Sequence, residues 1–151
     1  MFRVTKTYGH DLGITAAFRQ HRADSHCRFI HGYSLAFELV FECQDSKRDE
    51  RGWVTDFGGL KPIKDWLVET FDHKLLIAAD DPKRAQLEEL GVAGLAAIRV
   101  LERGVGCEAF AVLIYDYVES WLRMDQQKHV HLVSVQVSEH GANSATYYPG
   151  C

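Results

Sequence analysis

Large apolar residues occupy every second position between residues 31 and 43, from Tyr33 to Phe41. Such alternation predicts a half-buried antiparallel strand. Residues 2–10 alternate in a similar way, so they predict a second strand. Residues 11–30 break the pattern, and we interpret them as a connection. Connections of that length in a compact domain are usually functional.

The second half of the chain has helical periodicity in two places. Residues 60–70 predict a helix with Asp56 as a plausible N-cap. Residues 107–124 predict a longer helix, because apolar residues recur three and four positions apart. Shorter segments complete the picture: strands at 53–55, 96–101, 130–137 and 146–148, a charged hairpin connection at 44–52, a weakly helical stretch at 80–90 and turns at 104–106 and 141–144.

This order of elements predicts an α+β fold, in which a mainly antiparallel sheet carries two helices on one face. We expect one domain covering residues 1–151, since that length supports a single core. The content of 46% hydrophobic and 25% charged residues is typical of a soluble globular domain. No internal repeat or linker interrupts it.

Charge and hydropathy narrow the classes of partner. The net charge is −4, with no basic tail or stripe, so we expect no nucleic-acid partner. The N-terminus lacks the apolar run of a secretory signal, and no segment reaches the roughly 18 apolar residues of a membrane span. We therefore expect a cytoplasmic protein without a membrane partner. Its four cysteines form no Cys-x-x-Cys pair and are expected to be reduced.

Candidate chemistry centres on Cys27. It lies in a polar segment rich in arginine and histidine, and His31 follows four residues later. Cationic neighbours favour a reactive thiolate. Asp72 and His73 follow the first predicted helix as a possible acid/base pair, and Glu139 stands at the end of a predicted strand.

Five short motifs together resemble the 6-pyruvoyltetrahydropterin synthase / 6-carboxytetrahydropterin synthase family. They are Cys27-x-x-x-His31-Gly32-Tyr33, Gly52-Trp53-Val54-x-Asp56-Phe57, Phe71-Asp72-His73, Gly106-Cys107-Glu108 and Val137-Ser138-Glu139. The resemblance implies a tunnelling (T-fold) architecture, in which several subunits, usually six, build a barrel with active sites between protomers. It also implies zinc-dependent chemistry on 7,8-dihydroneopterin triphosphate, a pterin substrate.

The resemblance also assigns roles to individual residues. Cys27 matches the family's proton-transfer cysteine, and Asp72 and His73 match the rest of its relay. Glu139 matches the glutamate that anchors the pterin ring. The three residues between Cys27 and His31 resemble the 6-carboxytetrahydropterin branch, whose product feeds queuosine and related deazapurines.

The metal ligands depart from the family pattern of three histidines. His31 is retained, but Tyr33 stands at the second position of the family's His-Gly-His motif. Ala16-Ala17-Phe18 resembles the family's Ala-Ala-His, with phenylalanine in the ligand place. His10 is the preferred first ligand, since it follows a small residue at the end of the first predicted strand. His26, His21 or Tyr33 could supply the third.

Three outcomes for zinc follow: binding through a substitute ligand, weak binding, or a metal-free site. The function predicted first is a lyase that makes 6-carboxy-5,6,7,8-tetrahydropterin. A related pyruvoyl-type or aldolase-type pterin enzyme is the second hypothesis. A non-catalytic pterin-binding paralogue is the third, and Tyr33 motivates it.

Overall fold

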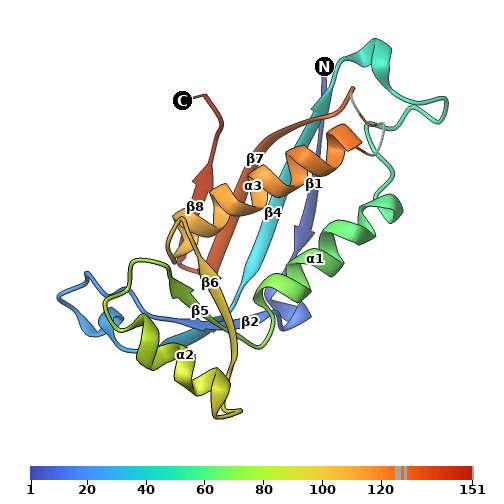
Figure 1. Ribbon diagram of the computed structural model, residues 1–151. Helices are drawn as coiled ribbons and strands as arrows, with labels where there is room; N and C mark the ends of the chain where they lie inside the picture. Colours follow the sequence, from blue (N-terminus) through green and yellow to red (C-terminus); the bar gives the residue numbers. More distant parts are fainter. Residues whose placement is uncertain (125–126, 128, 151) are drawn as a thin grey trace.

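The computed structural model describes residues 1–124, 127 and 129–150, which form two four-stranded sheets and three α-helices. The main sheet is antiparallel, with strand order β1-β4-β7-β8 (Figure 1). Its strands are β1 (Phe2–Tyr8), β4 (Ala36–Cys43), β7 (His131–His140) and β8 (Asn143–Tyr147). The alternating sequence explains this sheet, because β4 alternates buried and half-buried residues throughout its length.

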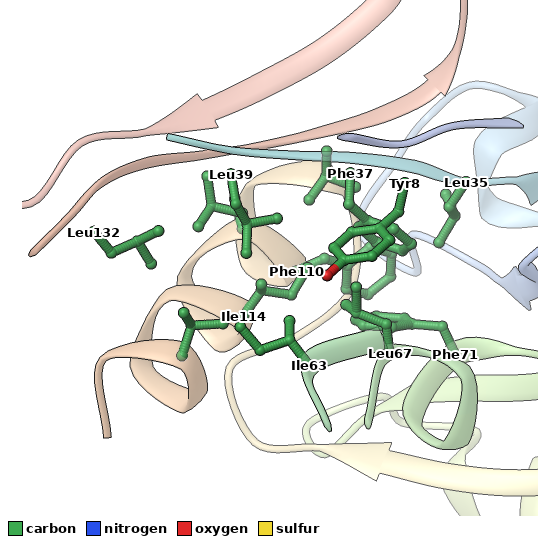
Figure 2. Close-up of a cluster of buried hydrophobic side chains, with 14 of the residues drawn as sticks. Tyr8, Leu35, Phe37, Leu39, Ile63, Leu67, Phe71, Phe110, Ile114 and Leu132 are labelled. Atoms are coloured by element: carbon green, nitrogen blue, oxygen red, sulfur yellow. The ribbon is translucent and has the colours of Figure 1, made fainter. Parts of the chain in front are cut away.

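Helices α1 (Lys61–Phe71) and α3 (Cys107–Met124) cover one face of the main sheet, as predicted. Figure 2 shows apolar side chains of the strands and of both helices meeting in this layer. Trp66 and Tyr117 stack with ring centroids 4.0 Å apart, which joins the two helices. Each large side chain buried here contributes about 1.5–3 kcal/mol. The largest fully buried side chains include Phe37, Phe41, Phe71, Phe110, Leu39, Ile63 and Leu67.

The small sheet was not predicted. Its order is β3-β2-β5-β6, formed by β3 (His31–Ser34), β2 (Thr15–Phe18), β5 (Lys74–Ala78) and β6 (Ala97–Leu101). Strand β2 is antiparallel to β3 and parallel to β5, which is also parallel to β6. Helix α2 (Arg84–Val92) packs on it through Leu87.

Two features explain why the sequence pattern did not predict the small sheet. Strand β2 has only four residues, too few for a clear period, so the whole of residues 11–30 was interpreted as a connection. Strand β5 is a continuous apolar run, as expected of a strand with parallel neighbours, and it does not alternate. The expected strand at 31–43 is two strands, since the chain leaves the small sheet at Leu35 and enters the main sheet.

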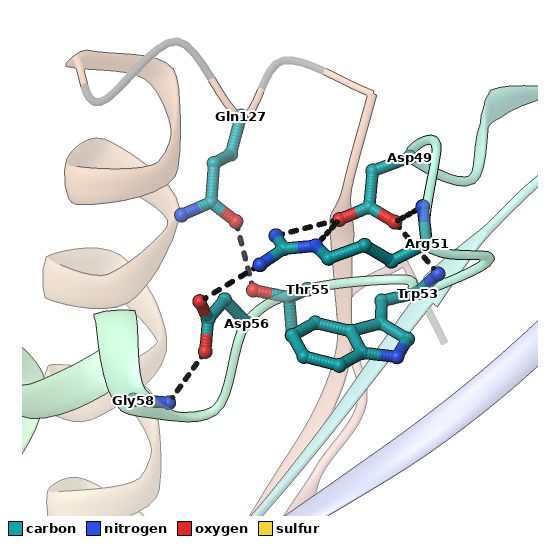
Figure 3. Close-up of polar contacts among 7 residues, drawn as sticks. All are labelled: Asp49, Arg51, Trp53, Thr55, Asp56, Gly58 and Gln127. Carbon is teal, nitrogen blue, oxygen red and sulfur yellow. Dashed lines mark hydrogen bonds and ion pairs between the residues drawn. The ribbon is translucent and has the colours of Figure 1, made fainter.

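The expected strand at 53–55 was wrong, because this segment is irregular. Figure 3 shows the polar contacts that shape it. Asp49 accepts hydrogen bonds from the backbone N–H groups of Arg51 and Trp53, both at 2.9 Å. The Trp53 bond is the main reason why the pKa of Asp49 is lowered. Asp56 accepts from the Gly58 N–H at 2.9 Å, ahead of the short 3₁₀ turn Gly58–Leu60. The N-cap of α1 is Leu60, so the expectation that Asp56 caps this helix was wrong.

The loop folds back on β1 and leaves aromatic side chains half exposed. Phe2, Trp53 and Phe57 are each about half exposed and line a pocket of about 380 Å³. Arg51 stacks over the Trp53 ring at 4.1 Å. Among the residues described, no helix has the length and apolar character needed to cross a bilayer.

Candidate functional site

Cys27 lies on a short 3₁₀ turn, His26–Arg28, between β2 and β3. The Ser25 hydroxyl accepts a hydrogen bond from the Cys27 N–H at 3.3 Å, and the Cys27 carbonyl accepts one from the Gln20 N–H at 2.9 Å. The thiol is half-buried and forms no disulfide. The backbone around Cys27 is therefore held from both sides, while the residue remains partly exposed.

Three side chains from three other elements lie near this turn: Tyr33, Glu139 and Cys107. Burial raises the pKa of Tyr33 most, and the nearby Glu139 carboxylate and the side chains of Cys27 and Cys107 raise it further. Tyr33 comes from β3, Glu139 from the end of β7 and Cys107 from the start of α3. Two of the predicted site residues, Cys27 and Glu139, thus both lie within electrostatic reach of Tyr33.

Cys107 differs from Cys27 in its surroundings. Burial, followed by the charges of Glu139 and Glu108, raises the pKa of the Cys107 thiol to about 12. A hydrogen bond from the Glu139 backbone opposes this shift. Cys107 therefore stays protonated at neutral pH and serves as a packing contact between α3 and β7.

An aromatic cluster adjoins these residues where β2 pairs with β3. Phe18 is the cross-strand partner of His31, and Tyr33 lies two residues further along β3. The ring centroids are 5.3 Å apart for Phe18 and His31, 5.3 Å for His31 and Tyr33, and 6.1 Å for Phe18 and Tyr33. We call these three rings the Phe18–His31–Tyr33 cluster. Residues 31 and 33 share one side of β3, as predicted.

This donor set does not fit the zinc that the resemblance implies. A zinc site with an open position uses three nitrogen, sulfur or carboxylate ligands. The cluster offers one imidazole, one phenol and a phenyl ring that has no donor atom. No group of three His, Cys, Asp or Glu side chains that could hold a metal occurs among the described residues. The predicted zinc site is not confirmed.

The other predicted ligands lie elsewhere in the chain. His10 is on a 3₁₀ turn after β1, and its Nδ1 lies 2.5 Å from the Ser34 carbonyl, at the end of β3 opposite to His31. Three residues of strand separate these ends by about 10 Å, and the described residues show no cluster of three possible ligands that includes both histidines. His26 is exposed on the Cys27 turn. The His21 side chain is only 8% exposed and faces Asp80 at 4.0 Å.

Asp72 and His73 form the expected pair between α1 and β5. Asp72 Oδ1 lies 2.9 Å from His73 Nδ1 and accepts a hydrogen bond from the Thr15 N–H at 3.0 Å. The Thr15 bond is the first cause, and His73 a further one, of the lowered pKa of Asp72. The imidazole itself is largely exposed, with 85% of its side-chain surface open. It is therefore oriented by Asp72 and free to reach a group outside its own chain.

His73 also has an unusual backbone. Its φ of 55° makes it the one residue other than glycine with a positive φ in the described part of the chain. Such a conformation costs a bulky residue of the order of 1 kcal/mol or more. Backbone strain of this kind concentrates at functional sites, where the surrounding structure holds it in place.

The two halves of the predicted relay lie at opposite ends of β2. Asp72 binds Thr15 at the start of the strand, whereas the Cys27 turn is bonded to Gln20, just beyond Phe18 at its end. Thr15 and Phe18 are about 10 Å apart along the strand. No hydrogen bond or ion pair joins Cys27 to Asp72 or His73 within the described chain.

Comparison with solved structures defines the class of fold. An uncharacterized protein of Wolinella succinogenes, WS1659, superposes with a TM-score of 0.79 at 18% identity over 98% of both chains. The 6-pyruvoyl tetrahydropterin synthases of Plasmodium vivax and Caenorhabditis elegans give TM-scores of 0.61 and 0.58 at 14% and 16% identity. The first comparison covers all of both chains, and the second covers 99% of this chain and 94% of the other. The chain is a T-fold protein.

Sequence comparison gives the family. The model of the family described as 6-pyruvoyl tetrahydropterin synthase matches residues 10–150, so the chain belongs to that family. The 6-carboxy-5,6,7,8-tetrahydropterin synthase of Rickettsia felis is 33% identical over 87 residues, which span 57% of this chain and 59% of that protein. The protein of the same name from Aquifex aeolicus is 26% identical over 97% of this chain and 88% of its own length.

Sequence reasoning missed the meeting of Phe18 with His31 and Tyr33. The Ala16-Ala17-Phe18 motif contained the signal, because it pointed to a ligand place occupied by phenylalanine. The preference for His10 rested on its position after a strand-like run. The pairing of β2 with β3, which sets residue 18 opposite residue 31, could not be inferred while residues 11–30 were interpreted as a connection.

Proposed function

We propose that this chain is a pterin lyase that acts on 7,8-dihydroneopterin triphosphate and forms 6-carboxy-5,6,7,8-tetrahydropterin. The observation that supports this proposal most directly is the gathering of Cys27 and Glu139 around Tyr33. Relatives named for this product share the family. The product would enter queuosine and related deazapurine synthesis in the cytoplasm, and residues 1–151 would act as one domain.

Each proposed role follows from the chemistry of a side chain. The Glu139 carboxylate accepts two hydrogen bonds from the amino group and adjacent ring N–H of the pterin, a charge-assisted contact that fixes the ring. Cys27 transfers a proton at the substrate side chain, which its half-buried position allows. Asp72 orients the His73 imidazole and stabilises its protonated form.

We propose that Cys27 of one protomer works with Asp72 and His73 of a neighbour. The separation of the two halves along β2 and the exposure of His73 support this arrangement. The main sheet has β1 and β8 at its edges, where a second chain can add strands. The exposed aromatic residues beside β1 favour burial against another chain. A hexameric barrel is the assembly that the resemblance implies.

A second candidate function is supported by the Phe18–His31–Tyr33 cluster. A chain with a single imidazole there could bind a pterin without catalysis, or carry out a pyruvoyl-type or aldolase-type reaction. Incubation of the purified protein with 7,8-dihydroneopterin triphosphate, followed by mass spectrometry, separates these functions. The lyase yields 6-carboxy-5,6,7,8-tetrahydropterin with release of triphosphate and of the other two side-chain carbons as a two-carbon fragment. A different pterin product identifies the related enzymes, and unchanged substrate in complex with the protein identifies the binder.

A further inference from the structure

The Phe18–His31–Tyr33 cluster has a ring spacing that a three-imidazole metal site could share, but it lacks the donors of such a site. Three imidazoles bound tetrahedrally at 2.0–2.1 Å would place their ring centroids about 5 Å apart. The observed separations of 5.3, 5.3 and 6.1 Å come close to that spacing. Two of the three rings, however, belong to Phe18 and Tyr33. The rings of phenylalanine and tyrosine can occupy the positions of imidazole ligands, but they have no imidazole nitrogen that could bind a metal.

One hydrogen bond fixes the orientation of the His31 ring and leaves its other nitrogen, Nε2, without a partner in the described part of the chain. Its Nδ1 lies 2.7 Å from the Phe29 carbonyl, and a carbonyl can only accept, so Nδ1 carries the hydrogen. In the neutral ring, Nε2 is therefore a hydrogen-bond acceptor. The Tyr33 hydroxyl can donate or accept, and the described part of the chain gives it no hydrogen-bond partner. Neither His31 Nε2 nor the Tyr33 hydroxyl is therefore committed to a hydrogen bond within the described part of the chain.

No nearby histidine replaces the missing donors. His140 is the next ring, with its centroid 6.0 Å from that of Tyr33. Both of its ring nitrogens lie 3.2 Å from groups of its own hairpin, the Ala142 N–H and the Asn143 side-chain nitrogen. A protein phenol is neutral at physiological pH, which makes Tyr33 a poor zinc ligand. His31 is thus left as a single imidazole, and one imidazole is too few for a stable zinc site.

We propose that His31 and Tyr33 bind the side-chain oxygens of the ligand directly by hydrogen bonds, so that ligand binding at this site needs no zinc. His31 Nε2 accepts from a ligand hydroxyl, and the Tyr33 hydroxyl donates to a second oxygen. Phe18, buried behind them, supports both rings. The identity of the ligand, a reduced pterin with a hydroxylated side chain, rests on the proposed function. The inference that the site binds no zinc rests only on the donor atoms of His31, Tyr33 and Phe18.

Metal titration tests the proposal without any pterin. We expect wild-type protein, dialysed against chelator and then titrated with zinc alone, to retain no stoichiometric zinc. The variant Phe18→His/Tyr33→His should complete the three-imidazole site and bind zinc about 100-fold more tightly or better. Cobalt(II) in the same variant should give the intense visible absorption of tetrahedral coordination, which the wild type should lack.

Matched variants separate ligand chemistry from folding. Phe18→Leu/Tyr33→Phe changes the same positions without adding donors and should bind no zinc. Phe18 is buried, so replacing it could disturb folding, and Tyr33→His alone is therefore the second variant. This variant should bind zinc more tightly than the wild type, because it offers two imidazoles. One zinc per wild-type chain that is lost in His31→Ala would overturn the proposal. So would equal zinc affinity in wild type and a folded Tyr33→His.

Ligand binding gives an independent readout. We expect 7,8-dihydroneopterin to bind the wild type equally well with and without chelator, and Tyr33→Phe to weaken binding about 10-fold through loss of one hydrogen bond. Binding that disappears with chelator and returns with zinc would overturn the proposal. If no reduced pterin binds under either condition, the proposed function fails, and the zinc titration still decides whether a metal site exists.

Discussion

The guanidinium of Arg19 holds the carboxylate of Asp81 with two hydrogen bonds, Nε to Oδ2 at 2.7 Å and Nη2 to Oδ1 at 2.9 Å. The same guanidinium donates through Nη1 to the Arg28 carbonyl at 3.2 Å. Arg28 is the neighbour of Cys27. The pair therefore connects the end of the small sheet to the turn that carries the proposed proton-transfer thiol.

Asp81→Asn should destabilise the protein by about 2–4 kcal/mol, because it leaves the partly buried Arg19 without its charged partner. Urea unfolding at pH 7 measures this loss. Asp116→Asn is the matched control. It breaks the exposed ion pair with Arg103 and should cost less than about 1 kcal/mol. Equal losses in the two variants would contradict the structural importance of the Arg19–Asp81 pair.

The effect of Asp81 should depend on pH in a defined direction. Its hydrogen bond with Arg19 is the main cause of its lowered pKa in the folded state. A lowered pKa stabilises the fold above the unfolded value, near pH 3.9, and this contribution disappears as the pH falls through the folded value. The stabilities of wild type and Asp81→Asn should therefore converge as the pH falls below 4. A constant difference from pH 7 to pH 2 would argue against this linkage.

Cys27→Ala should reduce turnover of 7,8-dihydroneopterin triphosphate by about 10²- to 10⁴-fold, the usual contribution of a general acid or base. Pterin affinity should change little, because Glu139 is intact. Cys43→Val serves as the control, since Cys43 is buried in β4, far from the site. Steady-state kinetics and equilibrium binding give the two readouts. Full activity in Cys27→Ala would refute the assigned role.

Glu139→Gln should weaken pterin binding by about 1.5–3 kcal/mol, because an amide offers one acceptor oxygen where the carboxylate offers two. Fluorescence titration with a reduced pterin measures the affinity. Glu89→Gln, at an exposed position of α2, should bind as the wild type does. If the two variants have the same affinity, Glu139 does not hold the ring.

Mixed oligomers test whether two protomers share a site. Cys27→Ala and His73→Asn should each be inactive alone, and asparagine tolerates the positive φ at position 73. When the two variants are unfolded, mixed in equal amounts and refolded together, about a quarter of the sites should combine an intact Cys27 with an intact His73 from a neighbour. Recovery of activity after mixing supports a shared site. If both residues acted within one chain, mixing would restore nothing.

The sequence predicted the main sheet and its two helices because each has a strong period. The elements at residues 2–10, 60–70, 107–124 and 130–137 are confirmed with small shifts at their ends. Strands β2 and β5 were missed for the opposite reason, since a short strand and a continuous apolar run carry no period. Pairing with strands far away in the sequence makes these segments into strands, and the local sequence pattern does not indicate that pairing.

The candidate site was predictable in part. That Cys27 and Glu139 both lie near Tyr33 depends on β3 and β7 converging, yet the motifs already named both residues. The positions of His10 and Phe18 depend on strand pairing, which is why the expected metal ligands did not come together. The wide separation of Asp72 and His73 from Cys27 is a property of the topology, and nothing in the local sequence indicates it.

Gly32 lies between His31 and Tyr33 and faces Ala17 across the β2–β3 pairing. A Cβ at Gly32 would come within 2.9 Å of the Ala16 carbonyl oxygen, which would force the two strands apart. The side chains of His31 and Tyr33 project from the other side of β3. Gly32 therefore maintains the close spacing of β2 and β3, while His31 and Tyr33 on the other side of β3 face the proposed ligand. Side chains at positions 31 and 33 can be exchanged without changing that spacing. In this small sheet, residues at positions 31 and 33 can therefore be exchanged between metal-binding and hydrogen-bonding side chains without disturbing the pairing of β2 with β3.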